Sequence, residues 1–179
     1  MTERRALNRA FTKEEVEARK PPRQKFDIDD YKPSGNLYKG VKTKDGRRLD
    51  YVEPSDAAAP TETWRMYPYK GDQEVDVPVV MTRAFTLFGR VAANVDVVLR
   101  HRSVEPQHAV VQFRTFGERV LPYVIDLGSK EGTWLNKQRV APKTYVELRH
   151  GDVVWFGRSS TDYLVLNEKQ LKKAKKLLQ

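Results

Sequence analysis

Short runs of β-branched and aromatic residues, separated by turn signals, fill the chain between Trp64 and Leu166. Turn signals such as Lys70-Gly71-Asp72 end a run every few residues, so no run has the length of a typical helix. Many short strands at close spacing predict an antiparallel β-sandwich. The predicted strands cover residues 64–69, 77–81, 86–88, 96–99, 109–114, 120–126, 133–135, 139–140, 145–148, 153–156 and 163–166.

Four short motifs follow one another along this region. They are Phe88-Gly89-Arg90, Gln107-His108-Ala109, the segment from Asp126 to Asn136, and the segment from Gly151 to Gly157. Their order and spacing resemble those of the forkhead-associated (FHA) family over about residues 64–166. The resemblance implies an all-β fold, an antiparallel FHA β-sandwich whose loops normally bind phosphothreonine peptides. Five residues are expected to brace the loops and turns: Gly89, His108, Gly132, Thr133 and Asn136.

Within this family, the chain resembles the FHA subunit of the pre-mRNA retention and splicing (RES) complex. That likeness implies a nuclear, spliceosome-associated adaptor whose arm, ahead of the domain, docks on an RNA-recognition-motif subunit. Other subunits of the complex and the spliceosome are then the further partners. The stretches that carry the likeness are Trp64–Lys70, Gln107–Arg114, Pro122–Ser129 and Tyr145–Leu148 in the domain, and Ser34–Leu37, Gly40-Val41 and Tyr51–Pro54 in the arm.

The residues at the family's phosphopeptide-binding positions depart from the family pattern. Arg90 is retained, but Glu105-Pro106-Gln107-His108 stands where the family has Ser-Arg-x-His, and Glu131, preceded by Lys130, stands where it has Asn. Ionised carboxylates only accept hydrogen bonds and repel phosphate, so the sequence predicts a degenerate pocket. Two arrangements fit it. Glu105 fills the phosphate's place and pairs with Arg90, or both glutamates face solvent and Arg90 braces its loop.

The first 60 residues predict a largely extended N-terminal arm. Thr12-Lys13-Glu14-Glu15 is a capping box that favours a short helix over about residues 13–20, which Pro21-Pro22 ends. Apolar residues between 26 and 54 follow no helix or strand period. This segment either docks on a partner, or packs on its own domain or stays disordered. The partner-docking residues are then Phe26, Tyr31, Leu37, Tyr38, Val41, Tyr51 and Pro54.

The expected organisation has three parts: the arm over 1–60, with its docking segment at about 26–54, the FHA domain over 61–166, and a short basic C-terminal helix over 167–179. The helix places Leu171, Ala174 and Leu178 on one face. It either contacts RNA or serves as a solvated end that covers the sandwich with its apolar face. The RNA-contacting residues would be Lys172, Lys173, Lys175 and Lys176.

Several functional classes find no support in the residues. The chain has no cysteine, its three histidines lack metal-ligand spacing, and no Gly-rich phosphate loop is present. No apolar run reaches the roughly 20 residues that cross a bilayer, and the N-terminus does not resemble a secretory signal. We therefore expect a soluble, intracellular protein with no enzymatic activity or cofactor. The resemblance implies that it is nuclear, and we expect it to be monomeric on its own. Two alternatives remain open: a phosphothreonine-binding FHA module in nuclear signalling, and an RNA-binding protein that uses its basic tails.

Overall fold

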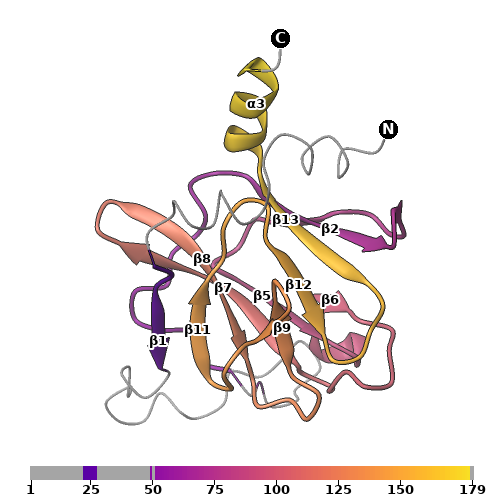
Figure 1. Ribbon diagram of the computed structural model, residues 1–179. Helices are drawn as coiled ribbons and strands as arrows, with labels where there is room; N and C mark the ends of the chain where they lie inside the picture. The colour runs from indigo at the N-terminus through magenta and orange to yellow at the C-terminus, as the bar shows by residue number, and fades with distance from the viewer. Residues whose placement is uncertain (1–21, 28–48, 50, 178–179) are drawn as a thin grey trace.

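Two β-sheets face each other in the computed structural model, which describes residues 22–27, 49 and 51–177 (Figure 1). The first sheet has six strands, all antiparallel except for the short parallel pair β5–β6. In spatial order its strands are β1 (Lys25–Asp27), β11 (Thr144–Glu147), β8 (Arg119–Asp126), β7 (Ala109–Phe116), β5 (Phe85–Gly89) and β6 (Val97–Val98).

The second sheet is antiparallel throughout. A 3-10 helix, η3 (Ala92–Asn94), lies between β5 and β6 along the chain, and one α-helix, α3 (Glu168–Leu177), follows β13. The predicted all-β sandwich with a short C-terminal helix is thus confirmed. In spatial order the strands are β10 (Gln138–Arg139), β9 (Thr133–Leu135), β12 (Val153–Phe156), β13 (Asp162–Asn167), β2 (Trp64–Lys70) and β3 (Gln73–Glu74), and β4 (Val79–Met81) also pairs with β2.

Every predicted strand is present, with ends displaced by at most two residues. The sequence missed β1 and β3, which are three and two residues long and too short to show a period. The predicted helix over residues 13–20 lies outside the described residues. The turn between β7 and β8 is tighter than expected, because the strands continue to Phe116 and Arg119 and leave only Gly117 and Glu118 between them.

The main core lies between the two sheets. Phe88 is fully buried there, stacks on Phe156 with ring centroids 5.0 Å apart, and meets Tyr163 edge-on. β7 is buried on both faces over its first six residues. Since successive strand residues point to opposite faces, its second set of side chains requires a cover on the outside of the first sheet.

Residues from the arm provide that cover. Tyr51 is 2% exposed and belongs to an outer apolar cluster that Phe26 also packs against. The Tyr51 hydroxyl donates to the Gln112 carboxamide at 2.5 Å. Pro54, which follows shortly after Tyr51 in the chain, is also buried. The sequence predicts Phe26, Tyr51 and Pro54 as partner-docking residues. In the structure they pack with their own domain instead, because β7 and its neighbours need an apolar cover. This corresponds to the alternative in which the segment packs on its own domain. Tyr31, Leu37, Tyr38 and Val41 lie outside the described residues.

Replacing Phe88 with alanine should destabilise the sandwich by about 3–5 kcal/mol, because the cavity left between the stacked rings cannot close fully. Denaturant unfolding followed by tryptophan fluorescence measures the change. Phe116→Ala is the control, since Phe116 is 44% exposed, and should cost less than about 1 kcal/mol. Equal losses in both variants would contradict this assignment of the core.

Candidate functional site

Three loop regions meet at one end of the sandwich: residues 90–108, 127–132 and 157–161. They converge there because β7 begins where β8 ends, with Ala109 opposite Asp126, and β9 begins where β12 ends, with Thr133 opposite Phe156. This is the end at which the sequence places the phosphopeptide-binding positions.

His108 joins two of these loops from a fully buried position. Its Nδ1 accepts a hydrogen bond from the Glu105 amide at 3.1 Å, so its Nε2–H donates to the Gly132 carbonyl at 3.2 Å. One acceptor and one donor are the set that a neutral imidazole offers. Burial lowers the pKa of His108, against the opposing effect of the Asp126 carboxylate. The imidazole is therefore a structural link between loops.

The buried Asp126 carboxylate shapes the loop over residues 127–132. It accepts hydrogen bonds from the amides of Gly128 and Ser129 at 2.9 and 2.8 Å, and from the hydroxyls of Ser129 and Thr133 at 2.6 and 2.7 Å. Thr133 therefore holds this loop through Asp126, a residue of the third motif to which the sequence analysis gave no role. An Asp that bonds to the backbone two residues on is a known turn signal and could have been found.

Gly89 allows the first loop to approach the segment before His108. A Cβ at Gly89 would lie 2.2 Å from the Pro106 carbonyl oxygen, so no side chain fits there. Next to it, the Arg90 amide donates to the Glu105 carbonyl at 2.9 Å. Gly132 has a φ of 78° and lies under the Arg139 guanidinium, which makes it the second position where only glycine suits the loop.

The side chains at the four pocket positions do not form the pairing that one alternative predicts. The exposed Arg90 side chain donates from Nε to the Val104 carbonyl at 3.1 Å. No ion pair links Arg90 to Glu105 in the part of the chain that the structure describes. Glu131 instead accepts from the Arg158 Nε at 2.7 Å. Thus Arg90 bonds to its own loop, and a cation from the β12–β13 turn engages Glu131.

Lys130 and Arg158 complete the exposed surface of this end. Lys130 is exposed, and its carbonyl accepts from the Arg139 guanidinium at 3.1 Å. Arg158 is 76% exposed at its side chain, and nothing in the motif pattern could have indicated its pairing with Glu131. The sequence therefore predicted the positions in the loops, but it did not predict that the Arg158 guanidinium pairs with Glu131.

Asn136 lies at the opposite end of the sandwich from these loops. It and Lys137 both have positive φ, as a two-residue turn between β9 and β10 requires. Its carboxamide donates to the Asp152 carboxylate at 2.8 Å and accepts from the Val153 amide at 3.0 Å. Asn136 therefore holds the turn between β9 and β10 against the start of β12.

Helix α3 is fixed at its base. The Asn167 carboxamide oxygen accepts from the Gln170 amide at 3.0 Å as an N-cap, and Leu171 packs on the apolar cluster of β12 and β13. The rest of the helix projects beyond the sandwich (Figure 1). Lys172, Lys173 and Lys176 are exposed, and the Lys175 side chain is outside the described set.

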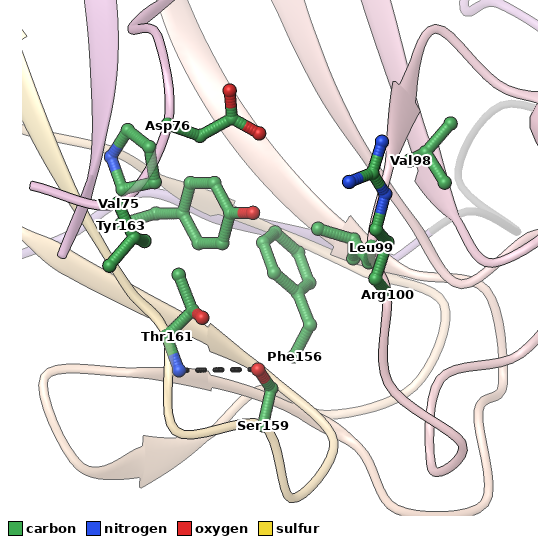
Figure 2. Close-up of a pocket in the computed structure, with 10 residues that line it drawn as sticks. Val75, Asp76, Val98, Leu99, Arg100, Phe156, Ser159, Thr161 and Tyr163 are labelled. Carbon is green, nitrogen blue, oxygen red and sulfur yellow. Dashed lines mark hydrogen bonds between the residues drawn. The ribbon is translucent and has the colours of Figure 1, made fainter. Parts of the chain in front are cut away.

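A hollow of about 200 Å³ lies beside the loop end, between β13 and the loop that follows β6 (Figure 2). Phe156 and Tyr163 form its floor, with Asp76 and Arg100 on opposite sides. Burial, and to a lesser extent the Asp76 carboxylate, raises the pKa of Tyr163 to about 12. None of the four pocket positions lines this hollow.

Residues 86–157 match the family model of the FHA domain. The chain contains an FHA domain. The match covers the first two loop regions, residues 90–108 and 127–132, and ends at Gly157, the first residue of the third.

Two relatives of the FHA domain and its flanks have names that refer to nuclear interaction and to pre-mRNA. The chain is 40% identical over 144 residues to mouse Smad nuclear-interacting protein 1, covering 75% of this chain and 38% of that protein. It is 28% identical over 166 residues to Pre-mRNA leakage protein 1 of Saccharomyces cerevisiae, covering 75% of this chain and 81% of that one. The chain thus spans less than two fifths of the length of the mouse relative.

The solved structure of the yeast Pml1 splicing factor, described with its integration into the RES complex, shares the fold. The TM-score is 0.59 at 25% identity, over 67% of this chain and 98% of that one.

Within residues 22–27, 49 and 51–177, no cluster of three or more His, Cys, Asp or Glu side chains could hold a metal ion. The helices of the described region are too short or too polar to cross a bilayer.

The buried neutral His108 should make the FHA domain less stable as the pH falls. Below the ordinary His pKa of about 6.5, the unfolded chain binds a proton that the folded chain does not, so the free energy of unfolding falls with the pH. Between pH 7 and 5.5, wild type should lose more stability than His108→Gln, by up to about 1 kcal/mol, the limit for an imidazole that stays neutral in the folded chain. Denaturant unfolding at both pH values measures this. Identical slopes for wild type and His108→Gln would contradict the prediction.

Proposed function

We propose that this chain is a non-enzymatic adaptor subunit of the spliceosome-associated pre-mRNA retention and splicing complex. The similarity to yeast Pre-mRNA leakage protein 1 carries the proposal, because it extends over 81% of that protein and its structural counterpart is described in the RES complex. A nuclear location follows from such a role. FHA domains are interaction modules. The loop end has a backbone held by buried hydrogen bonds and charged side chains at its surface, and both suit binding to another protein.

The composition of the loop end supports a role other than ordinary phosphothreonine binding. A phosphate needs fixed cations and hydrogen-bond donors. Here Arg90 donates to a carbonyl of its own loop, and Pro106 has no amide hydrogen. Glu131 adds a carboxylate, and one unit charge at about 4 Å from a phosphate costs on the order of 4 kcal/mol at an effective dielectric near 20. The Arg158 cation that pairs with Glu131 offsets part of this repulsion but adds no donor in the place of the lost carboxamide.

In this proposal, the arm docks on an RNA-recognition-motif subunit through a segment within about residues 26–54. The described part of that segment already packs on the FHA domain through Phe26 and Tyr51. The exposed lysines of α3 supply a second, electrostatic contact with RNA, since cations that neutralise phosphates release counterions.

Restoring the family residues at the loop end should create phosphothreonine binding. Wild type is expected to bind a phosphothreonine peptide library no more tightly than the unphosphorylated library. The triple variant Glu105→Ser/Pro106→Arg/Glu131→Asn should gain at least about tenfold in affinity, because it removes two repulsive charges and adds donors. Fluorescence polarisation measures both. Adding Arg90→Ala to the triple variant should abolish the gain, and micromolar phosphopeptide binding by wild type that Arg90→Ala removes would overturn the degenerate-pocket proposal.

Affinity purification of the tagged full chain from its own cells should recover splicing subunits, including one with an RNA-recognition motif. Deleting residues 28–48, which leaves Phe26, Tyr51 and Pro54 to cover the domain, should reduce that recovery at least tenfold, whereas the Arg90→Ala chain and phosphatase-treated extracts should give wild-type recovery. Quantitative mass spectrometry provides the measurement. Recovery that survives the deletion, or that depends on phosphorylation and Arg90, would contradict docking through the arm.

A further inference from the structure

The outer edge of β11 carries a segment from the arm. β1 pairs with β11 in antiparallel register, with Phe26 opposite Tyr145, at the end of the first sheet (Figure 1). The Glu147 amide donates to the Gln24 carbonyl at 3.1 Å, and the Arg149 guanidinium donates to the Pro22 carbonyl at 3.1 Å. Residues 22–27 are therefore held along the edge by their backbone, as in strand addition.

One end of this segment is fixed by a buried carboxylate. Asp152 is 2% exposed, and its two oxygens accept from the Arg23 guanidinium at 2.6 and 2.7 Å. It also accepts from the Arg149 amide at 2.6 Å and the Asn136 carboxamide at 2.8 Å, both neutral donors. A buried charge without a counter-charge is costly, and a guanidinium matches both carboxylate oxygens. The domain thus presents a receptor for an arginine side chain.

The other end is fixed by an aromatic and cationic surface. The Phe26 ring lies 4.8 Å from the Arg114 guanidinium carbon and meets the Tyr123 ring edge-on at 5.8 Å. Tyr145 lies 4.6 Å from the same carbon, and the Tyr123 hydroxyl donates to the Gln24 carboxamide at 2.5 Å. Gln24 and Phe26 reach one face because alternate strand residues share a face.

Arg114 is held ready for this contact by the domain itself. Its guanidinium is 2% exposed and forms a two-point ion pair with Asp56, with Nε–Oδ1 and Nη2–Oδ2 distances of 3.0 Å. A cation in a fixed position over aromatic rings favours an aromatic ligand group. The surface therefore has two binding positions: Asp152 accepts an arginine, and Arg114 with its aromatic neighbours accepts an aromatic residue. An extended segment that carries these two residues three positions apart contacts both.

We propose that the outer edge of β11, between Asp152 and Arg114, is a peptide-binding surface for an extended segment with arginine three residues before an aromatic residue. The chain's own residues 22–27 occupy it as a ligand in cis. The surface is separate from the phosphopeptide-binding positions, because Asp152 and its partner Asn136 lie at the opposite end of the sandwich. The proposal goes beyond the role in splicing: Phe26 belongs to both segments, but the binding test below uses no splicing partner.

A labelled peptide with the sequence of residues 22–27, flanked by glycines, tests this surface against the full chain. The Arg23→Ala/Phe26→Ala chain should bind the peptide at least tenfold more tightly than wild type, in which the tethered segment competes at high effective concentration. The same peptide with both residues changed to alanine should bind neither chain. Lys25→Ala is the matched control, since Lys25 is exposed, and should behave as wild type. Fluorescence anisotropy gives the affinities.

Equal affinity for wild type and the double variant, no binding to either, or binding that ignores the arginine and the aromatic residue would overturn the proposal. A thermal melt checks that the double variant is folded. If it is not, amide hydrogen exchange decides with single variants. The Glu147 amide, which donates to Gln24, should exchange at least tenfold faster in Arg23→Ala than in Lys25→Ala, and equal rates would overturn the proposal.

Discussion

The loop end depends on one buried, uncharged imidazole. His108 accepts from the Glu105 amide and donates to the Gly132 carbonyl, so it fixes the distance between two loops that have no strand pairing with each other. The Asp126 carboxylate, 3.9 Å away, accepts from three donors of the second loop and from the Thr133 hydroxyl at the start of β9, which keeps that loop in one conformation. Because both groups are buried, the bonds are made away from water, where an unpaired polar group costs most.

This frame separates the shape of the loops from the chemistry of their exposed side chains. Gly89, His108 and Gly132 use backbone contacts and close approaches, which keep the loops in place whatever side chains the surface carries. At the surface, Arg90 bonds to Val104 and Arg158 to Glu131. The same loop shape can therefore carry different surface side chains, which the proposed assembly role requires.

The sequence predicted the sandwich well because its strands carry local signals. Runs such as residues 109–114 and 120–126 are apolar, short and bounded by turns, and the structure has them as β7 and β8. β1 could not be predicted, because three residues show no period and its partner β11 lies more than 100 residues later. The same holds for the pairs Arg23–Asp152 and Arg158–Glu131, which depend on the tertiary fold. Motif spacing alone could not decide between the two arrangements considered for Glu105, because the Val104 carbonyl also accepts from the Arg90 side chain.

The position of β1 also determines what the first sheet exposes to other molecules. An uncovered edge strand offers free amides and carbonyls to any passing chain and so promotes aggregation. With β1 in place, the exposed edge belongs to a three-residue strand that carries the solvent-facing Lys25, and both features oppose such pairing. Removing the residues before position 28 would uncover β11 while leaving the inter-sheet core intact. Such a truncated chain is then expected to associate through β11, and it also leaves the buried Asp152 carboxylate without its counter-charge.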